Sequence, residues 1–115
     1  MKEQQTGIVT GNHRDSETIR QFLDGSVRSS VALRSAAIGL GTYKPGWQWS
    51  RHARPQTGRA SENHIGYILS GRMKIQDAAG TETEVGAGDA FEVGPGSDAW
   101  VVGDEPCVAL DFIPL

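Results

Sequence analysis

The feature that most constrains the fold of this chain is the recurrence of glycine-containing turns between short apolar segments. The chain has 15 glycines among 115 residues. Glycine favours turns that need a positive φ and disfavours helices. Short segments at this spacing predict an all-β domain, built as a barrel or a sandwich. After Val27 the predicted strands are 35–43, 47–52, 64–70, 72–76, 81–85, 90–93, 98–102 and 107–113.

The length fits one domain, since typical domains hold roughly 100–150 residues. We expect residues 1–29 to form an arm or entry segment that packs on the barrel or on a partner. Residues 30–115 would then form the barrel. Within the arm, Asp15 to Leu23 fits a short helix capped by Ser16, and equally a strand or an irregular segment. A hairpin through Ser70-Gly71 is expected to join strands 64–70 and 72–76.

Charge and cysteine content exclude several classes of protein. The net charge of −3 and the dispersed basic residues favour neither nucleic acid nor an anionic membrane as a partner. The single cysteine, Cys107, excludes an internal disulfide framework and a cysteine-based zinc cluster. The first ten residues are polar, and no apolar run nears the ~18 residues of a membrane span. We therefore expect a cytoplasmic protein without a membrane or nucleic-acid partner.

Glycines and histidines also recur in a recognisable order. The ordered sets are Gly46 followed after five residues by His52, His64 followed after six by Gly71, and Gly88-Asp89 followed by Gly94-Pro95-Gly96. Over about residues 30 to 113 this order resembles the two-motif signature of the cupin family. The phrases PGWQWSRH, HIGYILSGRM, GDAFEVGPG and DAWVVGDEP are similar to those of small single-domain cupins. The resemblance implies a double-stranded β-helix, a jelly-roll barrel of two packed antiparallel sheets.

In cupins two histidines, a glutamate and a further histidine hold one divalent metal. The resemblance places His52, Arg54, His64 and Ala99 at these positions. A guanidinium has no lone pair to give and a methyl group offers none. His52 and His64 thus remain as metal ligands, and Zn, Ni, Mn or Fe would need other ligands beside them. Candidates for these are water, Gln48, Glu62 and Asn63. One divalent metal and no metal both stay open.

Side-chain alternation along the predicted strands places a pocket inside the barrel. The inward positions are polar at one end and apolar at the other, which suits a small organic molecule. Arg54 beside His52 would make the pocket cationic and able to hold a carboxylate; alternatively it points to water. The predicted pocket residues are Gln48, Ser50, His52, Arg54, His64, Ile68, Met73 and Val101.

The same alternation places Trp47 and Trp49 on the outer face of the barrel, opposite in direction to His52. Two outward tryptophans on one strand would leave a large exposed apolar patch, which monomers rarely carry. We therefore expect a homodimer, with these tryptophans covered by another sheet or by the second subunit.

Three functions remain open. The first is a small-molecule-binding cupin without strong catalysis, because three of the four metal positions carry unexpected residues. The second is a metal-dependent enzyme, of dioxygenase or isomerase type, that acts on a small organic acid. The third is a structural or protein-interaction module. No Ser-His-Asp pattern, phosphate-binding loop or paired carboxylate stands out, so no catalytic residue is assigned.

Overall fold

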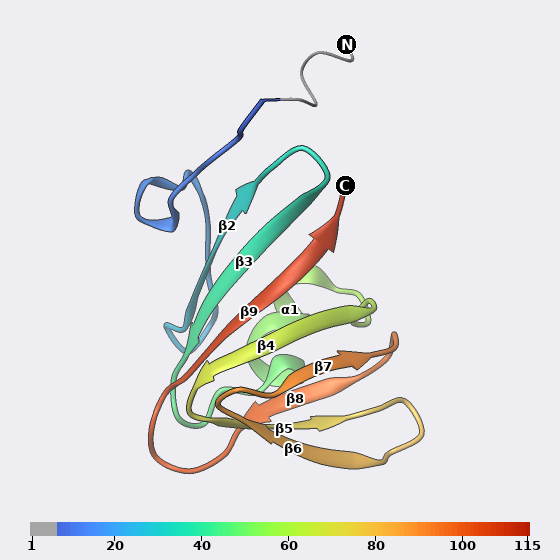
Figure 1. The fold of residues 1–115 in the computed structure, drawn as a ribbon. Helices are drawn as coiled ribbons and strands as arrows, with labels where there is room; N and C mark the ends of the chain where they lie inside the picture. The colour runs from blue at the N-terminus through green and yellow to red at the C-terminus, as the bar shows by residue number, and fades with distance from the viewer. Residues whose placement is uncertain (1–6) are drawn as a thin grey trace.

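Two antiparallel sheets pack against each other in the computed structural model, which describes residues 7–115 (Figure 1). The larger sheet has, in spatial order, β1 (Thr18–Gln21), β2 (Val27–Ala32), β3 (Ala36–Tyr43), β9 (Cys107–Pro114), β4 (His64–Ser70) and β7 (Ala90–Val93). The smaller sheet has the order β6 (Glu82–Gly86), β5 (Arg72–Gln76) and β8 (Asp98–Val101). The predicted all-β class with two packed antiparallel sheets is confirmed.

Alternation along the strands builds the core between the two sheets. Ile68 of β4, Met73 and Ile75 of β5, and Val101 of β8 are all buried, as their predicted inward direction requires. They join one apolar cluster with Trp47 and other buried side chains. Burying an aliphatic side chain of this size contributes roughly 1.5–3 kcal/mol. The core thus links β4 of the large sheet to β5 and β8 of the small sheet.

The expected hairpin between residues 64–70 and 72–76 does not form. β4 pairs with β7 and β9, whereas β5 pairs with β6 and β8. Gly71 between them has a φ of +79°, and a Cβ there would collide with the main chain of Pro106 and Cys107. At this close approach the chain passes from one sheet to the other, so the turn at Gly71 connects the two layers.

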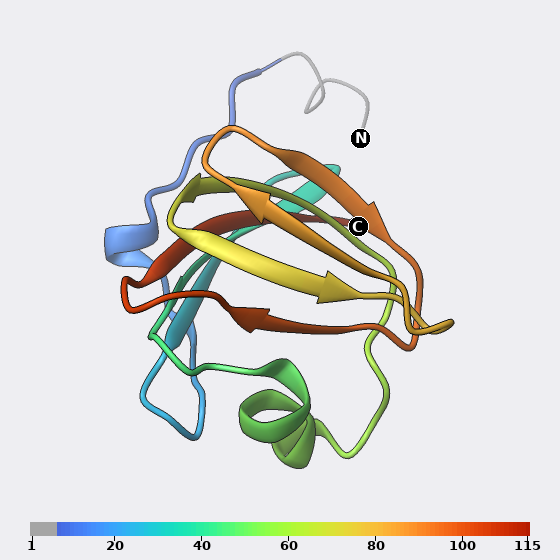
Figure 2. The same ribbon diagram turned by 90° about the horizontal axis from the view of Figure 1, so that it is seen from below.

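The predicted strand over 47–52 is wrong for most of its length. Trp49–Ala53 forms a π-helical turn, η3, and a short helix, α1 (Arg54–Thr57), follows it directly. Figure 2 shows both of them below the strands. Gln48 keeps one β-bridge, to Trp100. Side chains on a helical turn do not alternate between two faces, so the alternation that predicted an outward Trp49 and an inward His52 does not apply.

The first part of the chain contributes strands to the large sheet. A 3₁₀ turn, η2 (His13–Asp15), precedes β1, which pairs with β2, and β2 in turn pairs with β3. The segment from Asp15 to Leu23 therefore contains a strand and not a helix. β2 spans the predicted boundary between residues 29 and 30. Residues 1–6 of the predicted arm lie outside the described residues.

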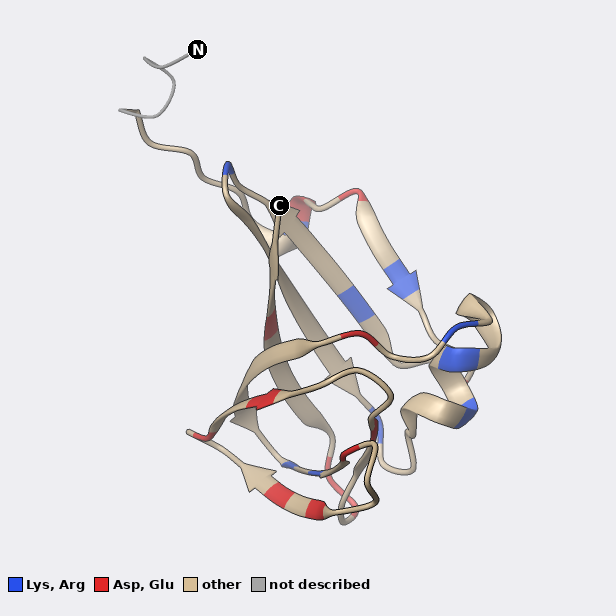
Figure 3. Ribbon diagram, turned by 90° about the vertical axis from the view of Figure 1, so that its right-hand side faces the viewer, with Lys and Arg blue, Asp and Glu red and all other residues tan. Residues whose placement is uncertain are grey.

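Charged side chains are unevenly distributed over the outside of the domain. Figure 3 shows the blue of arginine along η3 and α1, whereas β6 carries the red of two glutamates, Glu82 and Glu84. Arg51, Arg54 and Arg59 are all exposed. Within residues 7–115 no helix has the length and apolar character needed to cross a membrane.

Candidate ligand-binding cavity

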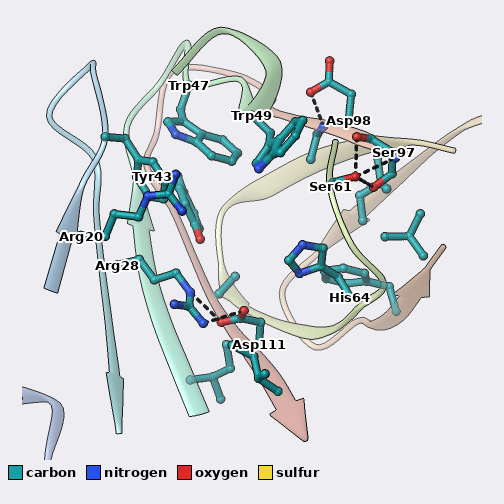
Figure 4. Close-up of a pocket in the computed structure, with 18 residues that line it drawn as sticks. Arg20, Arg28, Tyr43, Trp47, Trp49, Ser61, His64, Ser97, Asp98 and Asp111 are labelled. Carbon is teal, nitrogen blue, oxygen red and sulfur yellow. Dashed lines mark hydrogen bonds and ion pairs between the residues drawn. The ribbon is translucent and has the colours of Figure 1, made fainter. Parts of the chain in front are cut away.

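A cavity of about 260 Å³ lies between the two sheets. Small-molecule pockets usually measure roughly 300–1,000 Å³, so this one suits a small ligand. Its wall combines all six strands of the large sheet with β5 and β8 of the small sheet and with η3. The charged and aromatic side chains that line it are Arg20, Arg28, Asp98, Asp111, His64, Phe22, Tyr43, Trp47, Trp49 and Phe91 (Figure 4).

An ion pair between Arg28 and Asp111 forms one wall of the cavity. Nε and Nη2 of Arg28 donate to Oδ1 and Oδ2 of Asp111 at 3.1 and 2.9 Å. Both side chains are only 19% exposed. The pair crosses β3, where Gly39 leaves the necessary space, because a Cβ at that position would collide with both partners. The charge of Arg28 is thus neutralised inside the fold.

Arg20 brings a second guanidinium to the cavity. Its Nη2 donates to the main-chain oxygen of Ala53 at 3.2 Å, and its Cζ lies 4.9 Å from the centroid of the Phe22 ring. Among residues 7–115, none of the ion pairs involves Arg20. A guanidinium has five N–H donors. Arg20 therefore brings to the cavity a cation whose other N–H groups are free to bind a ligand.

Aromatic rings cover the side of the cavity next to Arg20. The rings of Tyr43 and Trp47 lie 4.3 Å apart between centroids, and Phe22 packs within 5.8 Å of Tyr43 and 5.5 Å of Trp47. Burial, followed by the charge of Asp111, raises the pKa of the Tyr43 hydroxyl well above its ordinary value. Tyr43 therefore keeps its proton. Trp49 and His64 border the open centre from different sides (Figure 4).

Asp98 lines the cavity but its oxygens are already occupied. Oδ1 accepts from the main-chain N–H groups of Ser50 and Ala99, at 3.0 and 2.9 Å. Oδ2 accepts from the Gln48 amide at 2.7 Å and from the Ser50 hydroxyl at 2.8 Å. These bonds tie the start of η3 to β8. They position Trp49, which lies between Gln48 and Ser50, at the cavity.

Two buried serines, Ser61 and Ser97, line the cavity on the side away from Arg20 (Figure 4). The Ser61 hydroxyl donates to the main-chain oxygen of Ser97 at 2.9 Å and accepts from the Ser97 N–H at 2.8 Å. Both side chains are buried and both line the cavity. They fasten the connection between α1 and β4 to the turn before β8.

The predicted pocket residues are only partly brought together. His64 lines the cavity, and Ile68, Met73 and Val101 are buried in the adjoining core but do not line it. Gln48 and Ser50 bind Asp98 instead of facing the open space. His52 is not among the lining residues, because the helical turn directs its Nδ1 to the Gln48 N–H at 3.0 Å. Arg54 is exposed at the start of α1, so the alternative interpretation, a side chain in water, applies.

The positions of the two tryptophans also correct the sequence interpretation. Trp47 is 4% exposed and belongs to the core, and Trp49 lines the cavity. Trp49 leaves the outer face because the chain at 49–53 is helical, and Trp47, just before this turn, packs on Phe22 and Tyr43. The original reason for expecting a homodimer is therefore wrong.

Sequence reasoning missed Arg20, Arg28, Tyr43 and Asp111. For Asp111 a signal was present: in the last predicted strand, Asp111 shares the inward direction with the apolar Cys107 and Ala109. A carboxylate on that side requires a buried partner. No comparable signal marked Arg20, since the segment around it had no settled secondary structure.

The four metal positions implied by the resemblance supply at most two ligand residues, His52 and His64. Within residues 7–115 no three His, Cys, Asp or Glu side chains gather closely enough to hold one. Arg54 is exposed, Ala99 contributes a methyl group, and one nitrogen of His52 binds the main chain. A metal on His52 and His64 stays a prediction.

Comparisons with known proteins agree with this architecture. A family model described as "Cupin domain" matches residues 39–113. KdgF from Halomonas sp. is 20% identical, with 96% of each chain covered and a TM-score of 0.65. A cupin-superfamily sugar phosphate isomerase from Silicibacter pomeroyi is 14% identical, with 93% of this chain and 76% of that chain covered and a TM-score of 0.68. The polyketide cyclase RemF from Streptomyces resistomycificus is 15% identical, with 94% of this chain and 80% of that chain covered and a TM-score of 0.65. No curated protein sequence matches significantly.

Proposed function

Because the chain belongs to the cupin domain family, we propose that it binds a small organic molecule in the cavity between its sheets. The observation that carries this proposal is the cavity of about 260 Å³ with Arg20 in its wall. Arg20 is half-buried and makes no ion pair within residues 7–115, and taking a charge out of water without pairing it costs free energy. A ligand that accepts its hydrogen bonds would remove that cost, whereas a purely structural core gains nothing from such a group.

Whether the domain also catalyses a reaction is a separate question. Two of the similar structures are described as a sugar phosphate isomerase and a polyketide cyclase, so this fold accommodates chemistry on small organic substrates. At 14 and 15% identity those reactions do not transfer to this chain. A metal-dependent dioxygenase or isomerase with His52 and His64 as ligands has less support, because its other two family positions cannot ligate. Binding is therefore the function we propose.

The proposal is tested with a panel of small acids, neutral compounds and amines. Melting temperature and tryptophan fluorescence are measured for the wild-type chain and for Trp49→Leu and Trp100→Leu. Trp49 lines the cavity and Trp100, on β8, does not. Ligands stabilise the state that they bind by mass action, so at least one compound should raise the melting temperature. Trp49→Leu should remove that shift and Trp100→Leu should keep it. No shift with any compound would refute the proposal.

We also propose that the domain is a homodimer, now through the outer face of the large sheet. Ile65, Tyr67 and Leu69 of β4 are 42, 38 and 45% exposed, and Phe112 of β9, the register partner of Ile65, is 37% exposed. An apolar patch of this kind suits an isologous contact with a second copy. Light scattering should give twice the chain mass, and Phe112→Asp should give the monomer mass. A wild-type monomer at high concentration would refute the dimer.

A further inference from the structure

We infer that the ligand is a flat carboxylic acid, whose carboxylate binds Arg20 and whose planar body packs on Trp49. This inference rests on the proposed function, since it names the chemical class that the same cavity takes. It follows from which charged groups of the cavity are already paired, from which aromatic face is open, and from the size of the space.

Among the described residues, one charged side chain of the cavity, Arg20, keeps most of its hydrogen-bonding groups free for a ligand. Arg28 donates twice to Asp111, and all the hydrogen bonds given above for Asp98 occupy both of its oxygens. Arg20, by contrast, makes one hydrogen bond, to a main-chain oxygen, within the described residues. A guanidinium binds a carboxylate through two parallel N–H···O bonds, which are stronger than bonds between neutral groups. Arg20 therefore offers an acid a cation with free N–H donors, whereas the oxygens of Asp98 and Asp111 already accept hydrogen bonds and offer less to an amine.

The aromatic walls favour a planar ligand body. Phe22, Tyr43 and Trp47 pack on one another, so part of their ring surface is covered. Trp49 makes no ring–ring pair within residues 7–115, and its indole borders the open centre (Figure 4). Aromatic side chains gain about 0.5–1.5 kcal/mol from a second ring beyond the area buried. A flat conjugated acid makes this contact, and a puckered aliphatic acid of the same size does not.

The position of Arg20 fixes the orientation of the acid. Its guanidinium lies over the Phe22 ring and is held by Ala53, at the aromatic end of the cavity. Figure 4 shows Trp49 and His64 bordering the centre beyond it. An acid anchored at Arg20 thus directs its ring toward Trp49 and its far substituent toward His64. With about 260 Å³ available, the cavity has room for an aromatic ring that carries a carboxylate.

Titration calorimetry with benzoate, benzamide and cyclohexanecarboxylate tests each part. Benzoate should bind at least about tenfold more tightly than benzamide, which has the same shape without the charge; tenfold corresponds to about 1.4 kcal/mol. Cyclohexanecarboxylate should bind more weakly than benzoate. In Arg20→Gln the preference for benzoate should disappear. The matched control Arg54→Gln, which removes an exposed guanidinium, should bind like the wild type.

The outcomes separate this inference from the proposed function. Equal binding of benzoate and benzamide, or an unchanged benzoate affinity in Arg20→Gln, overturns the acid class and leaves small-molecule binding standing. No binding by any compound of the wider panel overturns both. If Arg20→Gln does not fold, the wild-type ratio of benzoate to benzamide affinity still decides the question. Arg20→Lys keeps the positive charge but cannot form two parallel hydrogen bonds to a carboxylate. It should therefore show a smaller ratio of benzoate to benzamide affinity than the wild type.

Discussion

Arg28 of β2 and Asp111 of β9 meet across β3, the strand between them, over the bare main chain of Gly39. Three residues on neighbouring strands thus form one unit of the cavity wall. Because this ion pair neutralises Arg28, Arg20 is the guanidinium of the cavity that has no ion-pair partner within residues 7–115. The pair therefore influences both the stability of the large sheet and the charge that a ligand meets.

Asp111→Asn should lower the free energy of unfolding by about 2 kcal/mol. Each partner is 19% exposed, so the loss lies between that of an exposed pair, about 0–1 kcal/mol, and that of a fully buried one, about 3–5 kcal/mol. Urea denaturation measures it. The double variant Arg28→Gln with Asp111→Asn should lose less than the sum of the single changes, since the charge left unpaired by one change is absent. Additive losses would contradict this coupling.

Gly39→Ala should lower the free energy of unfolding at least as much as Asp111→Asn does, because the new methyl group would occupy the space of the ion pair. The matched control is Gly94→Ala. A Cβ at Gly94 meets nothing within 4 Å, and its φ is not in the left-handed region. That change should leave the free energy of unfolding within about 0.5 kcal/mol of the wild type. Similar losses in both variants would show that the open space at Gly39 is not needed.

Trp47 should tolerate phenylalanine far better than alanine. Its side chain is 4% exposed, and its Nε1 is buried without a hydrogen-bond partner among the described residues. The indole N–H thus contributes no hydrogen bond that phenylalanine would lose. Trp47→Ala should cost about 3–5 kcal/mol through the space left behind. Trp47→Phe should cost about 1–2 kcal/mol by the same reasoning. Thermal and urea denaturation of the two variants compare them directly.

Ser61→Ala should loosen the connection between α1 and β4. It leaves the N–H and main-chain oxygen of Ser97 without their buried partner, at a cost of about 1–3 kcal/mol. Trypsin should then cleave faster after Arg59, which is exposed in this connection. The control Ser35→Ala removes an exposed hydroxyl and should leave the cleavage rate unchanged. Equal rates in all three proteins would show that the two serines do not hold this segment.

The sequence predicted the strands well where residues alternate without interruption. Ile68, Met73, Ile75 and Val101 take their expected inward positions because each lies within a regular strand. The side-chain directions predicted from alternation at Trp49 and His52 were wrong because the chain forms the helical turn η3 there. No local sequence feature indicated that turn. From the sequence alone, the π-helical turn η3 and the proline-containing helix α1 cannot be told apart from an alternating strand followed by a loop.

The cavity was harder to predict than the fold. Arg20 lies in the segment 15–23, whose secondary structure stayed open, and Arg28 precedes the first strand given a range, 35–43. Their partners are distant in sequence: Ala53 for Arg20 and Asp111 for Arg28. Such contacts depend on strand order, which places β2, β3 and β9 side by side. Family motifs drew attention to His52 and Arg54, where this chain departs from the metal-binding pattern. Arg20, Arg28, Tyr43 and Asp111, which also line the cavity, lie outside those motifs.

Alkaline pH should destabilise the domain through two buried acids. Burial raises the pKa of the Cys107 thiol from 9.0 to about 11 and raises that of Tyr43 still further. The unfolded chain therefore releases these protons at lower pH than the folded chain. Stability that is complete near neutral pH should fall as pH rises from about 9, with Cys107 accounting for on the order of 2 kcal/mol by about pH 11. Urea denaturation as a function of pH should show a shallower decline for Cys107→Ala. A Cys107→Ala curve parallel to the wild type would mean that the thiol does not titrate differently in the two states.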